Sequence, residues 1–165
     1  LTGGLLLVAK NPAVVPILNR ELTTKTFHRE YLAKVIHADK LKKNGTIDLP
    51  ISQDPDDQRK RMVNKTGLHA VTHYELLKKY SDNTALVKLT LETGRTHQIR
   101  VHLSHLGHPI FGDTLYGEEF DDSSVIERQA LHAYGLDFES PRTRKSLSLR
   151  VSLPQDMEEL KERLK

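Results

Sequence analysis

The chain has 165 residues, no cysteine, a formal net charge of +3 and a sequence pI of about 9.1. This length suits one domain, so we expect residues 1–165 to fold as a single unit. The absence of cysteine excludes a disulfide framework and a thiol nucleophile, and it favours a cytoplasmic protein. No apolar run in the sequence has the length of a membrane span. The modest positive charge favours a polyanionic partner, which a local patch must select.

The first two predicted elements are a strand and a helix. Residues 4–9 form a continuous apolar run after two glycines, which predicts a central strand buried on both faces. Asn11 then has the character of an N-cap, with Pro12 at the first helical position. Apolar side chains recur at helical spacing from Val14 to Leu22. We therefore expect a helix directly after the first strand.

The third predicted element is a strand over residues 27–37, where apolar and polar side chains alternate. Its two faces carry Tyr31, Ala33 and Val35 on one side and Glu30 and Lys34 on the other. The alternation indicates a strand with one side turned to the core and one side turned to solvent or to a ligand.

A turn, a loop and a hairpin follow. Residues 45–50 predict a turn, and the polar, charge-rich residues 52–66 predict a mobile surface loop. Residues 70–78 and 84–91 predict two strands joined by the turn-forming triplet Ser81-Asp82-Asn83. This hairpin would deliver the chain directly into a basic segment.

The basic segment, residues 91–117, concentrates arginine, histidine and glutamine side chains that can hold phosphate, sugar or carboxylate. Ile99, Leu103 and Leu106 recur at helical spacing there, and Gly107 with Pro109 supplies a stop, which predicts a helix over residues 96–106. Beyond it we expect an acidic loop at 118–124, strands at 130–138 and 146–151, and a closing helix marked by Met157, Leu160 and Leu164. The mixture predicts an α+β protein with a mixed, mainly antiparallel sheet and flanking helices.

Four segments together carry a family resemblance. They are TGRTHQIRVHLSHLGHPIFGDTLYG at 93–117, REYLAKV at 29–35, GTIDLPI at 45–51 and RQALHA at 128–133. In order and spacing the chain resembles the RluA-type pseudouridine synthases, and the likeness extends to its C-terminal part. The resemblance implies a cofactor-independent isomerase that acts on ribosomal or transfer RNA and converts uridine to pseudouridine. It also implies the catalytic fold of that family.

The resemblance places the key catalytic aspartate outside the sequence. In the family this residue belongs to an HRLDxxTSG-type motif, and Leu1-Thr2-Gly3-Gly4 matches only the end of it, with Gly3 in place of the usual serine. The aspartate would lie two positions before Leu1. We therefore expect a catalytic domain that lacks its N-terminal strands and is inactive as given for want of that acid.

Individual roles follow from matching positions. Tyr31 matches the family tyrosine that packs on the target base and is proposed to take the proton from C5. Arg100 matches the basic residue that pairs with the catalytic aspartate, and such a cation would keep a buried acid ionised and oriented. Leu131 matches an apolar wall of the uracil pocket. Arg95, His97 and Gln98, near the start of the predicted helix, are expected to bind RNA.

Two other interpretations compete with the enzyme. A non-catalytic RNA-binding domain without the acid would keep the same basic segment. A histidine metal-binding protein would use His97, His102, His105 and His108, although neither cysteine nor paired carboxylates complete such a set. Asp113 is expected to be a turn former that hydrogen-bonds its own backbone rather than the missing acid. No metal or organic cofactor is implied, and we expect a monomer without membrane contact.

Overall fold

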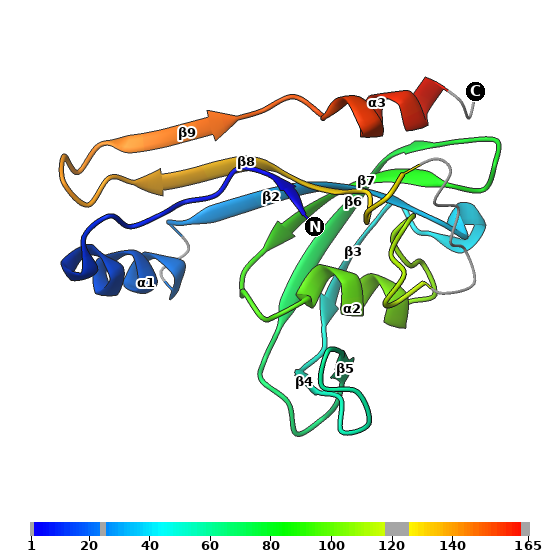
Figure 1. Cartoon of the computed structure of the whole chain (residues 1–165), viewed down its shortest axis with the longest axis horizontal. Coiled ribbons are helices and arrows are strands. Elements are labelled where there is room, and N and C mark those ends of the chain that lie inside the picture. Colours follow the sequence, from blue (N-terminus) through cyan, green and yellow to red (C-terminus); the bar gives the residue numbers. More distant parts are fainter. Residues whose placement is uncertain (1, 24–25, 118–125, 163–165) are drawn as a thin grey trace.

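The computed structural model describes residues 2–23, 26–117 and 126–162. Its main sheet contains β1 (Gly3–Gly4), β2 (His28–Val35), β3 (Asn44–Asp48), β6 (Val71–Lys79), β7 (Ala85–Leu91), β8 (Leu131–Glu139) and β9 (Ser146–Arg150). The strand order is β1-β8-β2-β7-β6-β3, with β9 also paired to β8 (Figure 1). Within the described residues β1 and β8 are the one parallel pair of this sheet, so the predicted mixed, mainly antiparallel α+β architecture is confirmed.

In the described residues three α-helices accompany the sheet: α1 (Val15–Thr23), α2 (Gln98–His105) and α3 (Gln155–Glu162). A short 3-10 helix, Pro12–Val14, precedes α1, and the Asn11 side chain accepts a hydrogen bond from the Ala13 amide at 3.0 Å, which confirms the predicted cap. Helices α2 and α3 lie on opposite sides of the sheet (Figure 1). Within the ranges described, no helix is both long enough and apolar enough to cross a membrane.

Strand β2 has two distinct faces, as the alternation predicts. Ala33 and Val35 are fully buried on the face that α2 covers. On the opposite face Lys34 is only 3% exposed, because α3 packs over it. Its Nζ donates a hydrogen bond to the Leu160 carbonyl at 3.2 Å, and burial lowers the pKa of the ammonium group. The second face of β2 is therefore an interior surface at this point and not a solvated one.

The prediction of a central, doubly buried strand at residues 4–9 is wrong. Of residues 2–9, only Gly3 and Gly4 pair with β8. One further hydrogen bond joins the Leu5 amide to the Ala133 carbonyl at 2.9 Å. Beyond that point β9 occupies the same edge of β8, from Gly135 onward. The N-terminal segment consequently leaves the sheet.

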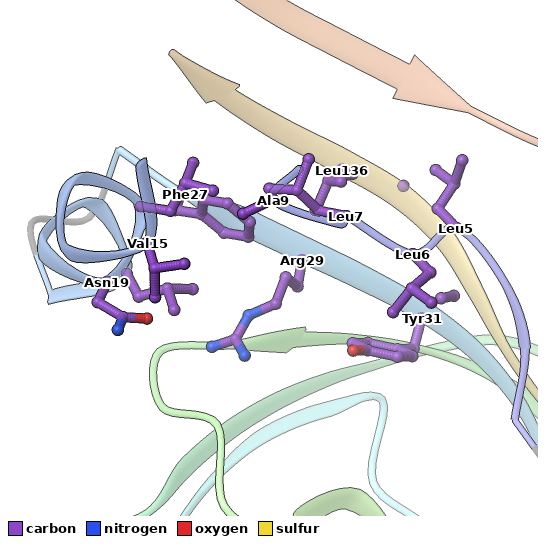
Figure 2. A pocket seen from close by; sticks show the side chains of 14 residues that line it. Leu5, Leu6, Leu7, Ala9, Val15, Asn19, Phe27, Arg29, Tyr31 and Leu136 are labelled. Carbon is purple, nitrogen blue, oxygen red and sulfur yellow. The ribbon is translucent and has the colours of Figure 1, made fainter. Parts of the chain in front are cut away.

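The segment then runs along the surface with alternate side chains inward. Leu5 and Leu7 pack toward a small cluster that contains Phe27 and Leu136 (Figure 2). Leu6 is 84% exposed. A single neighbouring strand can bury only one side of an apolar run, which is why the two-sided burial expected from the sequence does not occur.

Two further predictions need correction. Residues 45–50, predicted as a turn, contain most of β3, which pairs with β6 and buries Ile47. Residues 52–66, predicted as a mobile loop, contain a two-stranded hairpin of β4 (Ile51–Gln53) and β5 (Arg61–Val63). The Asp54 carboxylate accepts the amides of residues 56 and 57, so the polar residues that suggested mobility form the turn.

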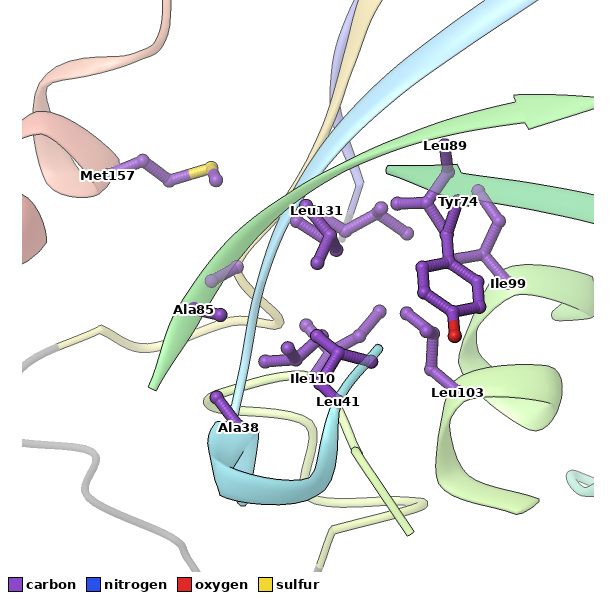
Figure 3. Close-up of a cluster of buried hydrophobic side chains, with 14 of the residues drawn as sticks. Ala38, Leu41, Tyr74, Ala85, Leu89, Ile99, Leu103, Ile110, Leu131 and Met157 are labelled. Carbon is purple, nitrogen blue, oxygen red and sulfur yellow. The ribbon is translucent and has the colours of Figure 1, made fainter. Parts of the chain in front are cut away.

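The main core joins α2 to the sheet (Figure 3). Ile99 and Leu103 project from α2 toward Leu89 on β7, as the predicted helical spacing requires. Met157 of α3 reaches the same strands from the opposite side. A fully buried aliphatic side chain of this kind stabilises a fold by about 1.5–3 kcal/mol. This packing fixes where the first turn of α2 stands, and that turn carries the basic residues.

The remaining predictions of strands and helices are confirmed where the structure describes the residues. The strands expected at 27–37, 70–78, 84–91, 130–138 and 146–151 are β2, β6, β7, β8 and β9, and the helix expected at 96–106 is α2. The triplet from Ser81 to Asn83 joins β6 to β7, and Asn83 adopts a positive φ of 61° there. The closing helix is α3. The acidic loop expected at 118–124 and Leu164 lie outside the described residues.

Candidate functional site

A pocket of about 670 Å³, called here the central pocket, opens between the N-terminal segment, β2, the start of β8 and the first turn of α2. All six residues selected from the sequence line it: Tyr31, Arg95, His97, Gln98, Arg100 and Leu131. Thr2 and Gly3 line it too, so the chain enters the fold at the rim of this pocket. Residues from the two ends of the lining, Thr2 and Ala133, therefore meet around one space although they lie far apart in the sequence.

Arg100 is held in the central pocket by Asp113. Its Nε and Nη2 donate to the two carboxylate oxygens of Asp113, each at 2.7 Å. The side chains are 13% and 0% exposed. Asp113 also accepts the amides of Leu115 and Tyr116, which confirms its predicted role as a turn former. The pairing with Arg100 was not predicted, although both residues stand in the same 25-residue motif.

A guanidinium group has five donors, and Asp113 occupies two nitrogens on one edge of it. The Arg100 guanidinium carbon also stands 4.9 Å from the centre of the Tyr116 ring, which stacks against the cation. The group is therefore fixed in orientation and retains donors on its other edge. Such a group can receive a second anion without first being reorganised.

Gln98 is buried and tied into the protein on every side. Its Oε1 accepts from the Thr93 hydroxyl at 2.8 Å and from the Arg95 amide at 3.0 Å. Its Nε2 donates to the Val71 carbonyl at 2.9 Å and to the Thr72 hydroxyl at 3.0 Å. With only 2% of its surface exposed, this side chain joins the first turn of α2 to β6. It positions the segment that carries Arg95.

The network continues from Thr72 to His102. The Thr72 hydroxyl and His102 Nδ1 lie 2.9 Å apart, and His102 Nε2 lies 2.9 Å from the Leu49 carbonyl. Because a carbonyl only accepts, Nε2 carries the proton and Nδ1 accepts from Thr72. Burial lowers the pKa of His102, which favours this neutral form. His102 is thus an interior support of α2.

His97 is the N-cap of α2 and adopts a positive φ of 56°. The Tyr116 hydroxyl accepts from the Arg61 amide at 2.9 Å and stands 2.9 Å from His97 Nδ1. The hydroxyl can donate its own proton to Nδ1, an arrangement that leaves the proton of the neutral ring on Nε2. Burial, followed by the charges of Arg100 and Arg61, lowers the pKa of His97. A neutral imidazole donor is thus available beside Arg100.

Arg95 is exposed at the mouth of the central pocket. Its Nε donates to the His69 carbonyl at 2.9 Å, which anchors one side of the guanidinium to the backbone. Its amide is held by Gln98, so both the backbone and the side chain of Arg95 are oriented. An arginine presented in this way suits a phosphate outside the pocket.

Tyr31 and Leu131 form the opposite wall of the central pocket. Leu131 is 4% exposed and lies on β8, next to β2. Burial raises the pKa of the Tyr31 phenol, and the charge of Arg29 partly opposes this. The phenol is therefore neutral in the empty pocket at neutral pH. Together the two side chains offer an aromatic ring, an aliphatic wall and a hydroxyl.

Three of the four histidines of the basic segment have separate hydrogen-bond partners. His97 contacts Tyr116, His102 contacts Thr72 and Leu49, and His108 Nδ1 lies 2.9 Å from the His37 carbonyl. Over the described ranges, no group of three or more histidine, aspartate or glutamate side chains is arranged to hold a metal ion. The metal-binding interpretation therefore gains no support from their positions.

Comparison with known proteins identifies the family of the chain. Residues 1–105 match the family model described as RNA pseudouridylate synthase. The chain belongs to the RNA pseudouridine synthase family. The matched region contains β1, β2 and α2, and with them most of the residues that line the central pocket.

Relatives support the same assignment. The chain is 44% identical to the RNA pseudouridine synthase YlyB of Bacillus subtilis over 164 residues, which covers 99% of this chain and 53% of the relative. It is 43% identical to ribosomal large subunit pseudouridine synthase D of Nitrosomonas europaea, covering 94% of this chain and 46% of the relative. The chain thus spans about half the length of these relatives.

A solved structure has the same fold. Human RNA pseudouridylate synthase domain containing 1 superposes with a TM-score of 0.73 and 25% sequence identity, covering 94% of this chain and 73% of that one. The predicted pseudouridine synthase fold is therefore confirmed.

Proposed function

We propose that this chain forms the catalytic domain of an enzyme that isomerises specific uridines in RNA to pseudouridine. The observation that carries the proposal is the meeting of Tyr31, Arg100 and the entry of the chain at Thr2 around one pocket. An aspartate two positions before Leu1 would arrive at that rim. Family membership and the names of the relatives support the reaction class, and ribosomal RNA is the first substrate to test because relatives are named for it.

In the proposed reaction the bond between N1 of uracil and C1′ of ribose breaks, the base turns, and C5 bonds to C1′. The proton on C5 leaves and N1 gains one, so the conversion needs no cofactor. The aspartate acts on the ribose, at C1′ or at the C2′ proton. The free edge of Arg100 keeps this acid ionised against the desolvation of the pocket and fixes its direction.

Tyr31 contacts the base and, as the phenolate formed when its own proton passes to water, accepts the C5 proton. Burial raises the pKa of the phenol, so the phenolate in this pocket is a stronger base toward the C5 proton than an exposed tyrosine would be. A stacked uridine cannot reach the pocket, so the nucleotide must be extruded at a cost of a few kcal/mol. Stacking against Tyr31 and contact with Leu131 offset part of that cost, at about 1–3 kcal/mol per stacked base.

The test uses the protein together with the residues that naturally precede Leu1, and RNA labelled with tritium at C5 of uridine. We expect tritium release from ribosomal or transfer RNA. Changing the preceding aspartate to asparagine, or making Arg100→Ala, should nearly abolish release while circular dichroism and RNA binding persist. Tyr31→Phe should retain binding and lose release.

A non-catalytic RNA-binding domain would behave differently. It would bind RNA with the same salt dependence and release no tritium from any cellular RNA pool. That result, obtained with the longer protein and a folded domain, would contradict the proposed function. Full activity in Arg100→Ala would remove the pairing role of Arg100 and leave the reaction class standing.

A further inference from the structure

A second pocket, called here the side pocket, lies across Tyr31 from the central pocket. Its volume is about 300 Å³, and it is enclosed by the N-terminal segment, α1, β2 and β8. The two pockets share Leu5, Leu6, Tyr31 and Ala133 as common walls. A chain molecule that fills the central pocket can therefore continue into the side pocket past the Tyr31 ring.

The lining of the side pocket is mainly apolar, with Asn19 as a polar member and one charged residue, Arg29. Arg29 projects from β2 between Tyr31 and α1 (Figure 2). Its Nε is buried and has no hydrogen-bond partner among the described residues. The neighbouring acid, Glu30, faces the other side of the sheet, where it pairs with Lys88 and Arg150. The pocket thus contains a partly desolvated cation without a carboxylate facing it in the described chain.

Gly94 makes room for this arginine. A Cβ atom at position 94 would lie 2.4 Å from Nη1 of Arg29, closer than any real contact. A side chain at position 94 would therefore push the end of the Arg29 side chain aside. The segment between β7 and α2 also carries Arg95, so Arg29 stands against the back of the loop that faces the central pocket.

From these features we infer that the side pocket binds the nucleotide adjacent to the target uridine, with its phosphate on Arg29 and its base against the apolar walls. This inference rests on the proposed function and extends the same site. A desolvated guanidinium without an anion is unfavourable, and a phosphate satisfies it with two parallel hydrogen bonds. Neighbouring nucleotides are joined through one phosphodiester, and the two pockets adjoin each other with Tyr31 as a shared wall.

The exposed apolar side chains at the pocket support a base as the second part of the ligand. Leu6 is 84% exposed and Val15 is 41% exposed, and both line the side pocket. A nucleobase has an apolar face that such side chains can cover. A peptide carboxylate would satisfy Arg29 equally well, and the experiment must therefore separate the two ligands.

The first measurement is the affinity of the chain for a short labelled single-stranded oligouridine over a range of salt concentrations. Removing the charge with Arg29→Met should weaken binding about tenfold. It should also lower the slope of log affinity against log salt by about 0.7, the value for one phosphate of a single strand. Lys42→Met removes the same charge from an exposed position away from both pockets and should change neither quantity.

Two further variants separate charge from position. Arg29→Lys keeps the charge and loses the two-point contact, so the salt slope should persist while affinity falls. Gly94→Ala keeps Arg29 and displaces its guanidinium, so affinity should also fall. Urea midpoints and circular dichroism of each variant report whether the fold is retained.

The base contact has its own test. Val15→Asp places an acid at the mouth of the side pocket and should weaken oligouridine binding. Leu77→Asp makes the same charge change at a residue that is 46% exposed on β6, and it should not. An oligonucleotide without the base next to the target uridine should bind more weakly to the unchanged chain, and Val15→Asp should then cost less.

Several outcomes would overturn the inference. They are an absence of oligouridine binding by the unchanged chain, an unchanged slope and affinity in folded Arg29→Met, or stronger competition by an acidic peptide than by a mononucleotide. If any of these results is obtained while the longer protein still releases tritium, the proposed function stands without a second subsite. If the longer protein releases no tritium although Arg29→Met alters RNA binding, the proposed reaction fails and the nucleotide subsite remains.

Discussion

Arg100 and Asp113 join the helix that lines the central pocket to the turn that follows it, through two hydrogen bonds of 2.7 Å. Asp113 is completely shielded from solvent, and it holds the backbone of its own turn with the same carboxylate. One acid thus fixes both the direction of a guanidinium and the path of the chain beneath it. The pair is part of the scaffold as well as of the site.

Asp113→Asn should therefore destabilise the protein strongly. The variant leaves the Arg100 cation without its anion, and breaking a buried ion pair on one side costs about 3–5 kcal/mol. Urea unfolding measures the loss. Asp57→Asn is the matched control, because Asp57 also forms a two-point pair, with Arg59, on an exposed turn. The control should unfold almost as the unchanged protein does. Equal losses of unfolding free energy in the two variants would contradict a larger contribution from the buried Arg100–Asp113 pair.

Gln98→Met should lower stability and disturb RNA binding together. The substitution keeps the volume and leaves the Arg95 amide and the Thr93 hydroxyl without their acceptor, at about 1–3 kcal/mol for each buried group. Because Arg95 then loses its anchor, the KM for RNA should rise. Gln155→Met, at an exposed position of α3, serves as the control. A stable Gln98→Met with unchanged unfolding but weak RNA binding would instead indicate direct contact with RNA.

Arg95→Ala should weaken RNA binding and reduce its salt dependence by about one phosphate. The side chain stands at the pocket mouth. Among the described residues its Nε alone donates a hydrogen bond, to the His69 carbonyl. Arg144→Ala, in the exposed turn between β8 and β9, removes an equal charge outside the site. An unchanged slope for Arg95→Ala would argue against a phosphate contact there.

Stability should fall as the pH drops below the ordinary histidine pKa of 6.5. Burial holds the pKa of His102 below that value, so the unfolded chain takes up a proton that the folded chain refuses. The stabilisation is present above pH 6.5 and is lost as the pH falls toward the lowered pKa. Urea midpoints at about pH 7.5 and about pH 5.5 measure this. His102→Gln should show a smaller difference between the two urea midpoints. His105→Gln, at an exposed position, should show the same difference as the unchanged protein.

Local periodicity was sufficient to predict β2, β6, β7 and α2, because each has a regular apolar face that the core uses. It could not predict that the segment after Gly4 leaves the sheet, since this depends on β9 reaching the same edge of β8 from far along the chain. The strands β4 and β5 have only three residues each, too few for an apolar pattern to mark them.

The site shows a similar division. A motif within 25 residues identified Arg95, His97 and Arg100, and the fold brings them to Tyr31 and Leu131. The sequence did not predict that Asp113 would hold Arg100, because pairing across a helix and a turn depends on three-dimensional geometry. Arg29 belongs to the 29–35 segment, but the sequence does not mark it as a site residue, since only the structure shows that its buried Nε has no hydrogen-bond partner in the described part of the chain.

Strand β2 presents Tyr31 to the central pocket and, three residues later on its reverse side, fastens Lys34 to the end of α3. A nucleotide that immobilises the aromatic ring would restrain this strand, and the restraint would pass to a helix that no nucleotide touches. Amide hydrogens of α3 should therefore exchange more slowly with solvent deuterium when the pocket is filled. Replacing Lys34 with methionine would uncouple the two layers and abolish that remote protection.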